Sequence, residues 1–117
     1  MRRLSGALGS VLGGVLRVAV VSGPSMVPTL RHGDRVLVRR TRPSALRRGD
    51  VVLVELPAGW IVKRIAALPG DPAPAGDRVP PGHVLLLGDN PLWSVDSRDF
   101  GYVPTAHVFG VAIRRLP

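Results

Sequence analysis

The sequence predicts a mostly β protein that folds as one domain. Short runs rich in Val, Leu and Ile recur along the chain, as they do in proteins built from short strands. The 14 glycines and 12 prolines fall mainly between these runs, where turns are expected. With 117 residues, the chain is long enough for one modest core but not for two. Together these observations favour a small barrel or sandwich.

Five segments carry the strand pattern. The first alternates valine with arginine, and the second is a continuous apolar run that follows a Gly-Asp turn. A connection rich in proline and glycine precedes the fourth, and the fifth bends at Gly110. We expect Val36, Val38, Val51 and Leu53 to build the core. The five segments are residues 34–40, 49–56, 59–68, 83–90 and 105–116.

The N-terminal segment is the most apolar part of the chain. After Arg2 and Arg3, the 18 residues LSGALGSVLGGVLRVAVV carry one charge, Arg17. Leucines and valines recur there at helical spacing, so we expect a short apolar helix within residues 1–21 that anchors in a membrane or lies on it. A bilayer span needs about 20 apolar residues, which makes this one marginal. The apolar run is shorter still if Val18 to Val21 already form a strand. A helix packed on the domain is the main alternative, and a cleavable signal peptide is another, although no obvious A-x-A site follows the run. With a membrane anchor, Arg2 and Arg3 would leave the folded domain on the extracytoplasmic side.

Composition excludes several kinds of site. The chain has no cysteine, which rules out disulfides, thiolate metal sites and a cysteine nucleophile. Its three histidines, His32, His83 and His107, are far apart in the sequence and lack a second ligand at metal spacing. We therefore expect no metal and no cofactor, and we treat His32 and His107 as surface residues.

The net charge of +8 has three interpretations. Nucleic-acid binding is disfavoured, because the arginines are scattered and the few aromatic residues do not interleave with the densest basic run. A basic face that meets anionic lipid headgroups fits the charge, and so does a plain solvated face, which is the simplest interpretation. Trp60 and Trp93 fit either a lipid surface or a packing role.

Two residues suggest chemistry. The segment SGPSMVPTL surrounds Ser25 with a glycine and prolines that constrain its backbone, as a packing turn or a nucleophile would require. Lys63 is the only lysine, and strand alternation puts it on one face with Ile61 and Ile65. Burial there would favour a neutral amine, which can take the proton of a serine hydroxyl. A lysine that extends to the strand edge is the other interpretation. Ser–Lys pairs are a known catalytic arrangement, and Ser94 offers a hydroxyl to steady the lysine.

Four ordered segments of the chain resemble those of bacterial signal peptidase I and its mitochondrial inner-membrane relatives, which are serine peptidases with a Ser–Lys dyad. The first alone would be a weak signal, but the ordered set is specific. The resemblance implies a mostly antiparallel β fold with small coiled barrels, and it makes residues 22–117 a minimal catalytic domain. The segments are SGPSMVPTL, RRGDVVLVE, VKRIAALPGD and GDNPLWSVDSRDFGYVP.

The resemblance assigns a role to each matching residue. It implies that Ser25 is the nucleophile, that Lys63 is its general base and that Met26 lines the substrate pocket. It also implies an oxyanion hole formed mainly by the Ser25 N–H, with Gly23 at the position where some members carry a contributing serine. The supporting residues that it implies are Ser94, which hydrogen-bonds the lysine amine, the charged pair Asp96 and Arg98, and the turn residues Asp89 and Asn90.

The implied reaction is the endopeptidase removal of a signal or leader peptide from a precursor protein after small residues, the A-x-A pattern. Such an enzyme would work at the cell membrane. Only sixteen residues separate Asp71 from Gly88, where larger signal peptidases insert a second β domain, so this chain resembles a bare catalytic core. Compact members include maturases dedicated to one cytosolic precursor, such as a nickel-type superoxide dismutase, and a cytoplasmic maturase is the main alternative. A non-enzymatic basic β domain that binds lipid or nucleic acid is the third hypothesis.

Overall fold

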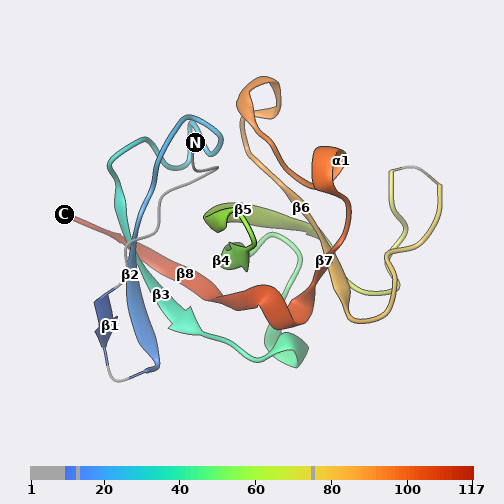
Figure 1. The fold of residues 1–117 in the computed structure, drawn as a ribbon, viewed down its shortest axis with the longest axis horizontal. Coiled ribbons are helices and arrows are strands. Elements are labelled where there is room, and N and C mark those ends of the chain that lie inside the picture. The colour runs from blue at the N-terminus through green and yellow to red at the C-terminus, as the bar shows by residue number, and fades with distance from the viewer. Residues whose placement is uncertain (1–9, 13, 75) are drawn as a thin grey trace.

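The computed structural model describes residues 10–12, 14–74 and 76–117, and the strands in these ranges form one antiparallel sheet (Figure 1). Their order across the sheet is β1-β2-β3-β8-β4-β5-β6-β7. The expected mostly β, antiparallel fold is therefore confirmed. The strands are β1 (Ser10–Leu12), β2 (Leu16–Val20), β3 (Arg35–Arg40), β4 (Val51–Leu56), β5 (Gly59–Ala67), β6 (His83–Leu87), β7 (Val103–Pro104) and β8 (Val108–Leu116).

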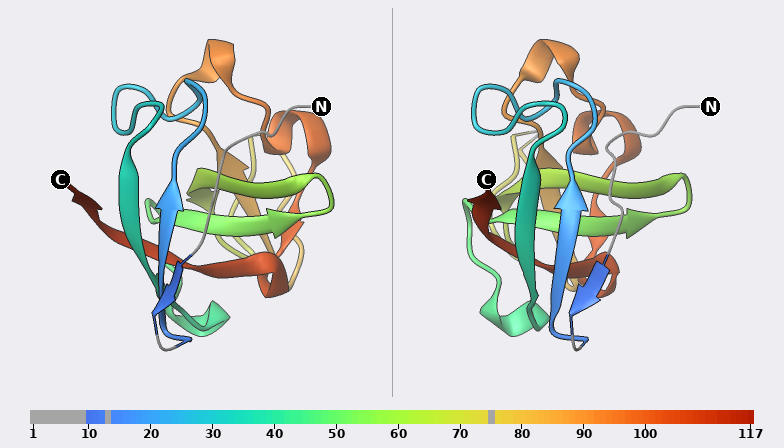
Figure 2. Two further views of the ribbon diagram at one scale, coloured as in Figure 1. Left: turned by 60° about the vertical axis from the view of Figure 1, so that its left-hand side comes forward. Right: turned by 90° about the vertical axis from the view of Figure 1, so that its left-hand side faces the viewer.

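The sheet is open and strongly bent, whereas the sequence favoured a small barrel or sandwich. β1 and β7 form its two edges, and within the described ranges they do not pair with each other. Figure 2 shows β2 and β3 running across the direction of β4 and β5. The ladders shift register between Leu37 and Val38 and between Leu53 and Val54, and irregularities of this kind bend a strand and increase its twist.

Helical structure in the described part of the chain is limited to short turns between strands. The five predicted segments correspond to β3, β4, β5, β6 and β8. The helices are α1 (Ser97–Phe100) and three 3₁₀ turns, Pro43–Ala45, Pro91–Trp93 and Thr105–His107.

The expected N-terminal helix is wrong for the described residues of its segment. β1 and β2 form a hairpin in which Ser10 is opposite Val18, and β2 then pairs with β3, with Val20 opposite Arg35. The valines among these apolar residues also suit a strand, because β-branched side chains pack well on a sheet. Residues 1–9 and 13 of the segment lie outside the described residues. No helix within the described ranges is both long and apolar enough to cross a membrane.

The β4–β5 hairpin separates two apolar clusters. Leu53 and Val62 belong to one cluster, and Val52, Val54 and Ile61 belong to the other. Because these strands are buried on both faces, their sequences are continuously apolar, as the second predicted segment is. Of the expected core residues, Val36, Val38 and Leu53 are buried and Val51 packs against them.

Candidate active site

Lys63 lies in the middle of β5, opposite Val52 of β4, and its side chain is fully buried. Ile61 and Ile65, its neighbours on the same face of the strand, belong to an apolar cluster. Burial lowers the pKa of Lys63 from 10.5 to about 8; the charge of Asp96 opposes this shift, and that of Arg98 adds to it. A fraction of this amine is therefore neutral near pH 7 and can accept a proton.

Ser94 connects this lysine to a buried carboxylate. The Lys63 Nζ donates a hydrogen bond to Ser94 Oγ at 3.2 Å. Ser94 Oγ donates its own proton to Asp96 Oδ2 at 2.8 Å. The serine proton therefore points toward Asp96, and an oxygen lone pair faces the lysine. A neutral amine that donates one N–H to Ser94 keeps its nitrogen lone pair available for another proton.

Asp96 is fully buried and holds this end of the site together. Its Oδ2 accepts from Gly88 N at 2.9 Å, and its Oδ1 accepts from Arg98 Nε at 2.9 Å. Burial alone would raise the pKa of Asp96, but the hydrogen bonds from Arg98, Gly88 and Ser94 outweigh it and lower the pKa to about 2. The residue also begins α1, where its side chain and that of Asp99 form a capping box. The Asp96 carboxylate is therefore charged and fixed at neutral pH.

Ser25 lies in the loop between β2 and β3, where it is only 4% exposed. Asn90 fixes this loop: its backbone N–H donates to Ser25 O at 2.9 Å, and its side-chain Nδ2 donates to Pro24 O at 3.1 Å. The Pro24 carbonyl and the Ser25 N–H share one planar peptide unit. By binding Pro24 O, Asn90 therefore sets the direction in which the Ser25 N–H points.

Gly88 brings the Ser25 loop and the Ser94 loop together. A Cβ added at Gly88 would lie 2.1 Å from Ser94 Oγ and 2.7 Å from Ser25 O. The Ser25 backbone and the Ser94 hydroxyl, which itself contacts Lys63, thus meet at this glycine. The hydrogen bonds of the described residues do not include one between the Ser25 hydroxyl and the Lys63 amine.

We expect Gly88→Ala to lower the peptidase activity that the sequence resemblance implies by about 100-fold, because displacing catalytic groups by about 1 Å has an effect of this size. The new methyl group would overlap Ser94 Oγ and the Ser25 carbonyl, and the carbonyl cannot rotate away as a flexible side chain could. Steady-state kinetics and denaturant unfolding of the purified variant check this. Gly70→Ala is the control, since it strains a positive-φ glycine in open space. Equal losses of activity in the two variants would contradict the argument.

A second charged pair braces the site from the other face of β5. Arg64 donates from Nε to Asp89 Oδ1 at 2.8 Å and from Nη2 to Asp89 Oδ2 at 2.7 Å. Thr29, in the Ser25 loop, donates to Asp89 Oδ2 at 2.5 Å. The hydrogen bond from Arg64 is the main reason that the pKa of Asp89 is lowered. This bidentate pair therefore joins β5, the Ser25 loop and the turn at Asp89 and Asn90.

The resemblance noted in the sequence can be set beside known proteins. The model of the family described as "Signal peptidase, peptidase S26" matches residues 4–74 and 71–116 of the chain. The chain belongs to the signal peptidase family. Signal peptidase I of Bacillus caldolyticus is 30% identical over an alignment of 134 residues. The alignment covers 78% of this chain and 74% of the relative.

Mitochondrial relatives of this signal peptidase-family chain are more similar. The mitochondrial ATP-independent inner membrane protease subunit 1a of Arabidopsis thaliana is 38% identical over 119 residues, covering 87% of this chain and 71% of the relative. The mitochondrial inner membrane protease subunit 1 of Schizosaccharomyces pombe is 36% identical over 118 residues, with 87% and 74% covered. The resemblance to the signal peptidase I family is confirmed, and the chain is a peptidase by family.

In this member of the signal peptidase family, the residues expected in the site fall into two groups. Ser94, Asp96, Arg98, Asp89 and Asn90 form one connected set of contacts around Lys63 and the Ser25 loop. Two others are less directly placed. Met26 is fully buried in an apolar cluster, so its contact with substrate stays a prediction. Gly23 donates its N–H to His32 Nδ1 at 3.0 Å, and its part in the oxyanion hole stays a prediction too.

Sequence reasoning missed several residues of this signal peptidase-family site. One of them is Arg64, which directly follows Lys63. Its positive charge and the negative charge of Asp89 are complementary, and this could have suggested the ion pair from the sequence. Gly88, Thr29 and His32 act through contacts between loops far apart in the sequence, which no local pattern reveals. In the part of the chain that is described, no three His, Cys, Asp or Glu side chains come together in a group that could hold a metal ion.

Proposed function

We propose that the chain is a serine endopeptidase that removes N-terminal signal or leader peptides after small residues, with Ser25 as nucleophile and Lys63 as general base. One observation carries this proposal: a fully buried lysine with a lowered pKa is hydrogen-bonded to Ser94, whose hydroxyl lies against the Ser25 loop. Membership of the signal peptidase family supports it. Groups with strongly perturbed pKa values cluster at functional sites, so the lowered pKa of Lys63 adds to this support.

The mechanism begins with the neutral Lys63 amine. It takes the Ser25 hydroxyl proton as Oγ attacks the peptide carbonyl, which gives a tetrahedral intermediate and an ammonium at Lys63. When the C–N bond breaks, that ammonium returns the proton to the leaving amine and leaves an acyl ester on Ser25. Neutral Lys63 then takes a proton from a water molecule that attacks the ester. The second collapse breaks the ester bond, and Lys63 returns the proton to Ser25.

The negative charge that develops on the carbonyl oxygen needs a donor that is already in place. We assign this role to the Ser25 N–H, whose peptide plane Asn90 holds through Pro24 O. Ser94 and the Asp96–Arg98 pair hold the lysine amine in a single position. This pre-positioning is what a weak nucleophile such as a serine hydroxyl requires.

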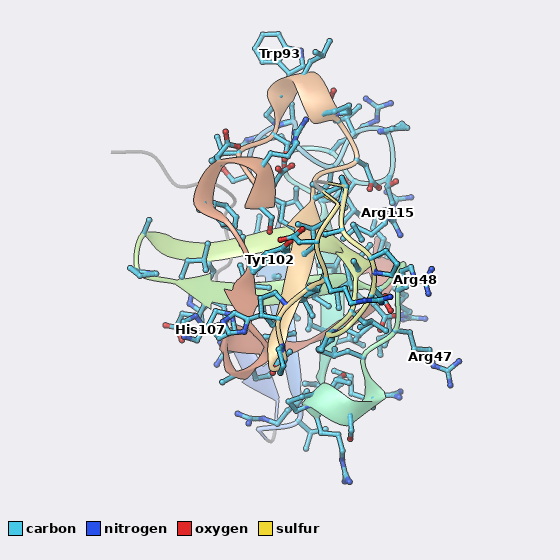
Figure 3. All side chains as sticks on the ribbon, turned by 90° about the vertical axis from the view of Figure 1, so that its right-hand side faces the viewer. Arg47, Arg48, Trp93, Tyr102, His107 and Arg115 are labelled. Carbon is cyan, nitrogen blue, oxygen red and sulfur yellow. The ribbon has the colours of Figure 1, made fainter. Side chains whose placement is uncertain are left out.

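We further propose that the enzyme works at a membrane, with its catalytic domain on the extracytoplasmic side. The mitochondrial relatives named as inner membrane proteases support this location. Figure 3 shows Trp93 at the tip of a loop that points away from the sheet; it is 69% exposed, and the adjacent Leu92 is 89% exposed. Aromatic side chains of this kind favour the interface of a bilayer. Residues 22–117 remain the proposed catalytic domain. Residues 1–21 remain the proposed N-terminal segment, of which β1 and β2 belong to the sheet and Ala19 and Val21 to its apolar core.

The test is cleavage of a secretory precursor with an A-x-A site by wild type and by Ser25→Ala. We expect wild type, in detergent or on lipid vesicles, to cut at that site, and we expect the Ser25→Ala rate to be lower by about 1,000-fold or more. Mass spectrometry of both fragments gives the position of the cut. Cleavage at that site by both proteins alike would contradict the role of Ser25.

Failure of both proteins on generic precursors would direct the search to a dedicated substrate. A maturase for a single precursor would keep the same dyad and act in the cytoplasm. Proteolysis of neither kind, together with salt-sensitive binding that Ser25→Ala does not change, would instead favour a basic β domain that binds lipid or nucleic acid.

A further inference from the structure

His32 makes a contact with the backbone just before the proposed nucleophile. Its imidazole Nδ1 accepts a hydrogen bond from the Gly23 N–H at 3.0 Å. Gly23 stands two positions before Ser25 and has a φ of +85°, a conformation that glycine adopts readily. An exposed histidine at the end of the β2–β3 connection is thus joined directly to the backbone that leads into Ser25.

This contact continues a backbone ladder. Beyond the β2–β3 pair, Val21 N donates to Asp34 O at 2.8 Å, and Gly33 N donates to Val21 O at 2.8 Å. The next N–H along this edge that finds an acceptor is that of Gly23, and the acceptor is the His32 ring nitrogen. The imidazole therefore takes the place of a backbone carbonyl at the point where the two chains separate to form the loop.

The position of this bond matters for Ser25. Residue 24 is proline, which has no N–H to donate. The backbone is therefore held at the groups on either side of that nitrogen: His32 accepts from the Gly23 N–H, and Asn90 donates to the Pro24 carbonyl. Asn90 fixes the Ser25 peptide unit, and His32 fixes the Ser22–Gly23 peptide unit. Release of either contact would let residues 23–25 rotate about the Gly23 backbone, because glycine is less restricted than the proline and serine that follow it.

We propose that His32 is a positioning residue that holds Gly23, and through it the Ser25 N–H and hydroxyl, in the orientation used for acyl transfer; this rests on the proposed function of Ser25. His32 does not touch the reacting atoms. The Gly23 N–H is occupied by His32, so its contribution to the oxyanion hole is indirect. The bond requires an unprotonated Nδ1, and a neutral imidazole that accepts at Nδ1 carries its proton on Nε2.

Three substitutions at His32 separate this role from general effects of the side chain. Asparagine places its carbonyl oxygen on Cγ, as histidine places Nδ1, so His32→Asn can accept the Gly23 N–H. Glutamine carries its oxygen one atom farther out, and alanine has no acceptor. We expect kcat for acylation to fall by about threefold to tenfold in His32→Ala and His32→Gln, the factor that corresponds to one lost hydrogen bond. We expect His32→Asn to stay within about twofold of wild type, with KM nearly constant throughout.

His107→Ala is the matched control, because it removes another exposed histidine, at the end of the 3₁₀ turn that precedes β8, and should leave kcat unchanged. Amide hydrogen exchange at Gly23, whose N–H donates to His32, provides a readout that needs no activity. It should quicken in the alanine and glutamine variants and stay slow in the asparagine variant. The ¹⁵N shifts of the His32 ring should show the Nε2–H tautomer.

The order of the variants decides the inference. An asparagine variant as slow as alanine, or unchanged exchange at Gly23 in all three variants, would overturn it. A wild type no more active than Ser25→Ala would overturn the proposed function instead, and the exchange measurements would still decide whether His32 orders the Ser25 loop.

Discussion

Replacing Lys63 by methionine should abolish peptidase activity and at the same time make the fold more stable. Methionine has a similar unbranched shape and suits the buried face that Lys63 shares with Ile61 and Ile65. It cannot take a proton, and loss of a general base lowers rates by about 100- to 10,000-fold. Kinetics on an A-x-A precursor and denaturant unfolding of the same preparations measure both effects.

The gain in stability follows from the lowered pKa of Lys63. The pKa in the folded protein is about 8 and the ordinary value is 10.5, so the fold disfavours the charged amine. Below pH 8 this burial costs the folded state about 3 kcal/mol, and the cost disappears as the pH rises from 8 through 10.5. We therefore expect Lys63→Met to be more stable at pH 7 and to lose this advantage above pH 10.

The pH profile of wild type provides the matching control. Because the base must be neutral, kcat/KM should fall about tenfold for each pH unit below the pKa of Lys63. Lys63→Arg keeps the positive charge but has no neutral form at any working pH, so it should be as inactive as the methionine variant. Substantial activity in Lys63→Arg, or a rate that does not change between pH 5 and 9, would contradict the base assignment.

The strands with strong local patterns could be predicted, and the parts that depend on tertiary pairing could not. The alternation around Val36 and Val38 and the apolar run of β4 corresponded to real strands. At β1, helical spacing of apolar residues was misleading, because pairing with β2 decides its structure. Whether the sheet closes depends on its two edge strands, β1 and β7, neither of which was expected.

The part of the candidate site whose residues lie close together in the sequence could be predicted. Ser94, Asp96 and Arg98 lie within one such segment, and the structure joins them by hydrogen bonds. The lowered pKa of Lys63 agrees with its expected place on an aliphatic face. Contacts such as Thr29 with Asp89 join loops that are sixty positions apart, and only the fold brings these together.

Asp96→Asn should destabilise the protein by about 2–3 kcal/mol at pH 7. The carboxylate accepts five hydrogen bonds from three residues, and an amide in its place would turn one acceptor into a donor that faces other donors. The folded pKa of about 2 lies below the unfolded value of 3.8, so the stabilisation is fully present above pH 4 and is lost as the pH falls through 2. The difference between wild type and variant should therefore shrink toward zero in acid.

Denaturant unfolding at pH 7 and near pH 2 measures this difference, with Asp77→Asn as the control. Asp77 is exposed, and among the described residues its side chain accepts only from the Tyr102 hydroxyl, so its substitution should change stability by less than about 0.5 kcal/mol at either pH. Asp96→Asn should also act on catalysis, because Asp96 raises the pKa of Lys63 and holds Ser94 against the lysine amine. Loss of the charge should lower the pKa of Lys63 further and move the acid limb of kcat/KM to lower pH. An acid limb that stays in place while stability falls would mean that Asp96 supports the fold without tuning the lysine.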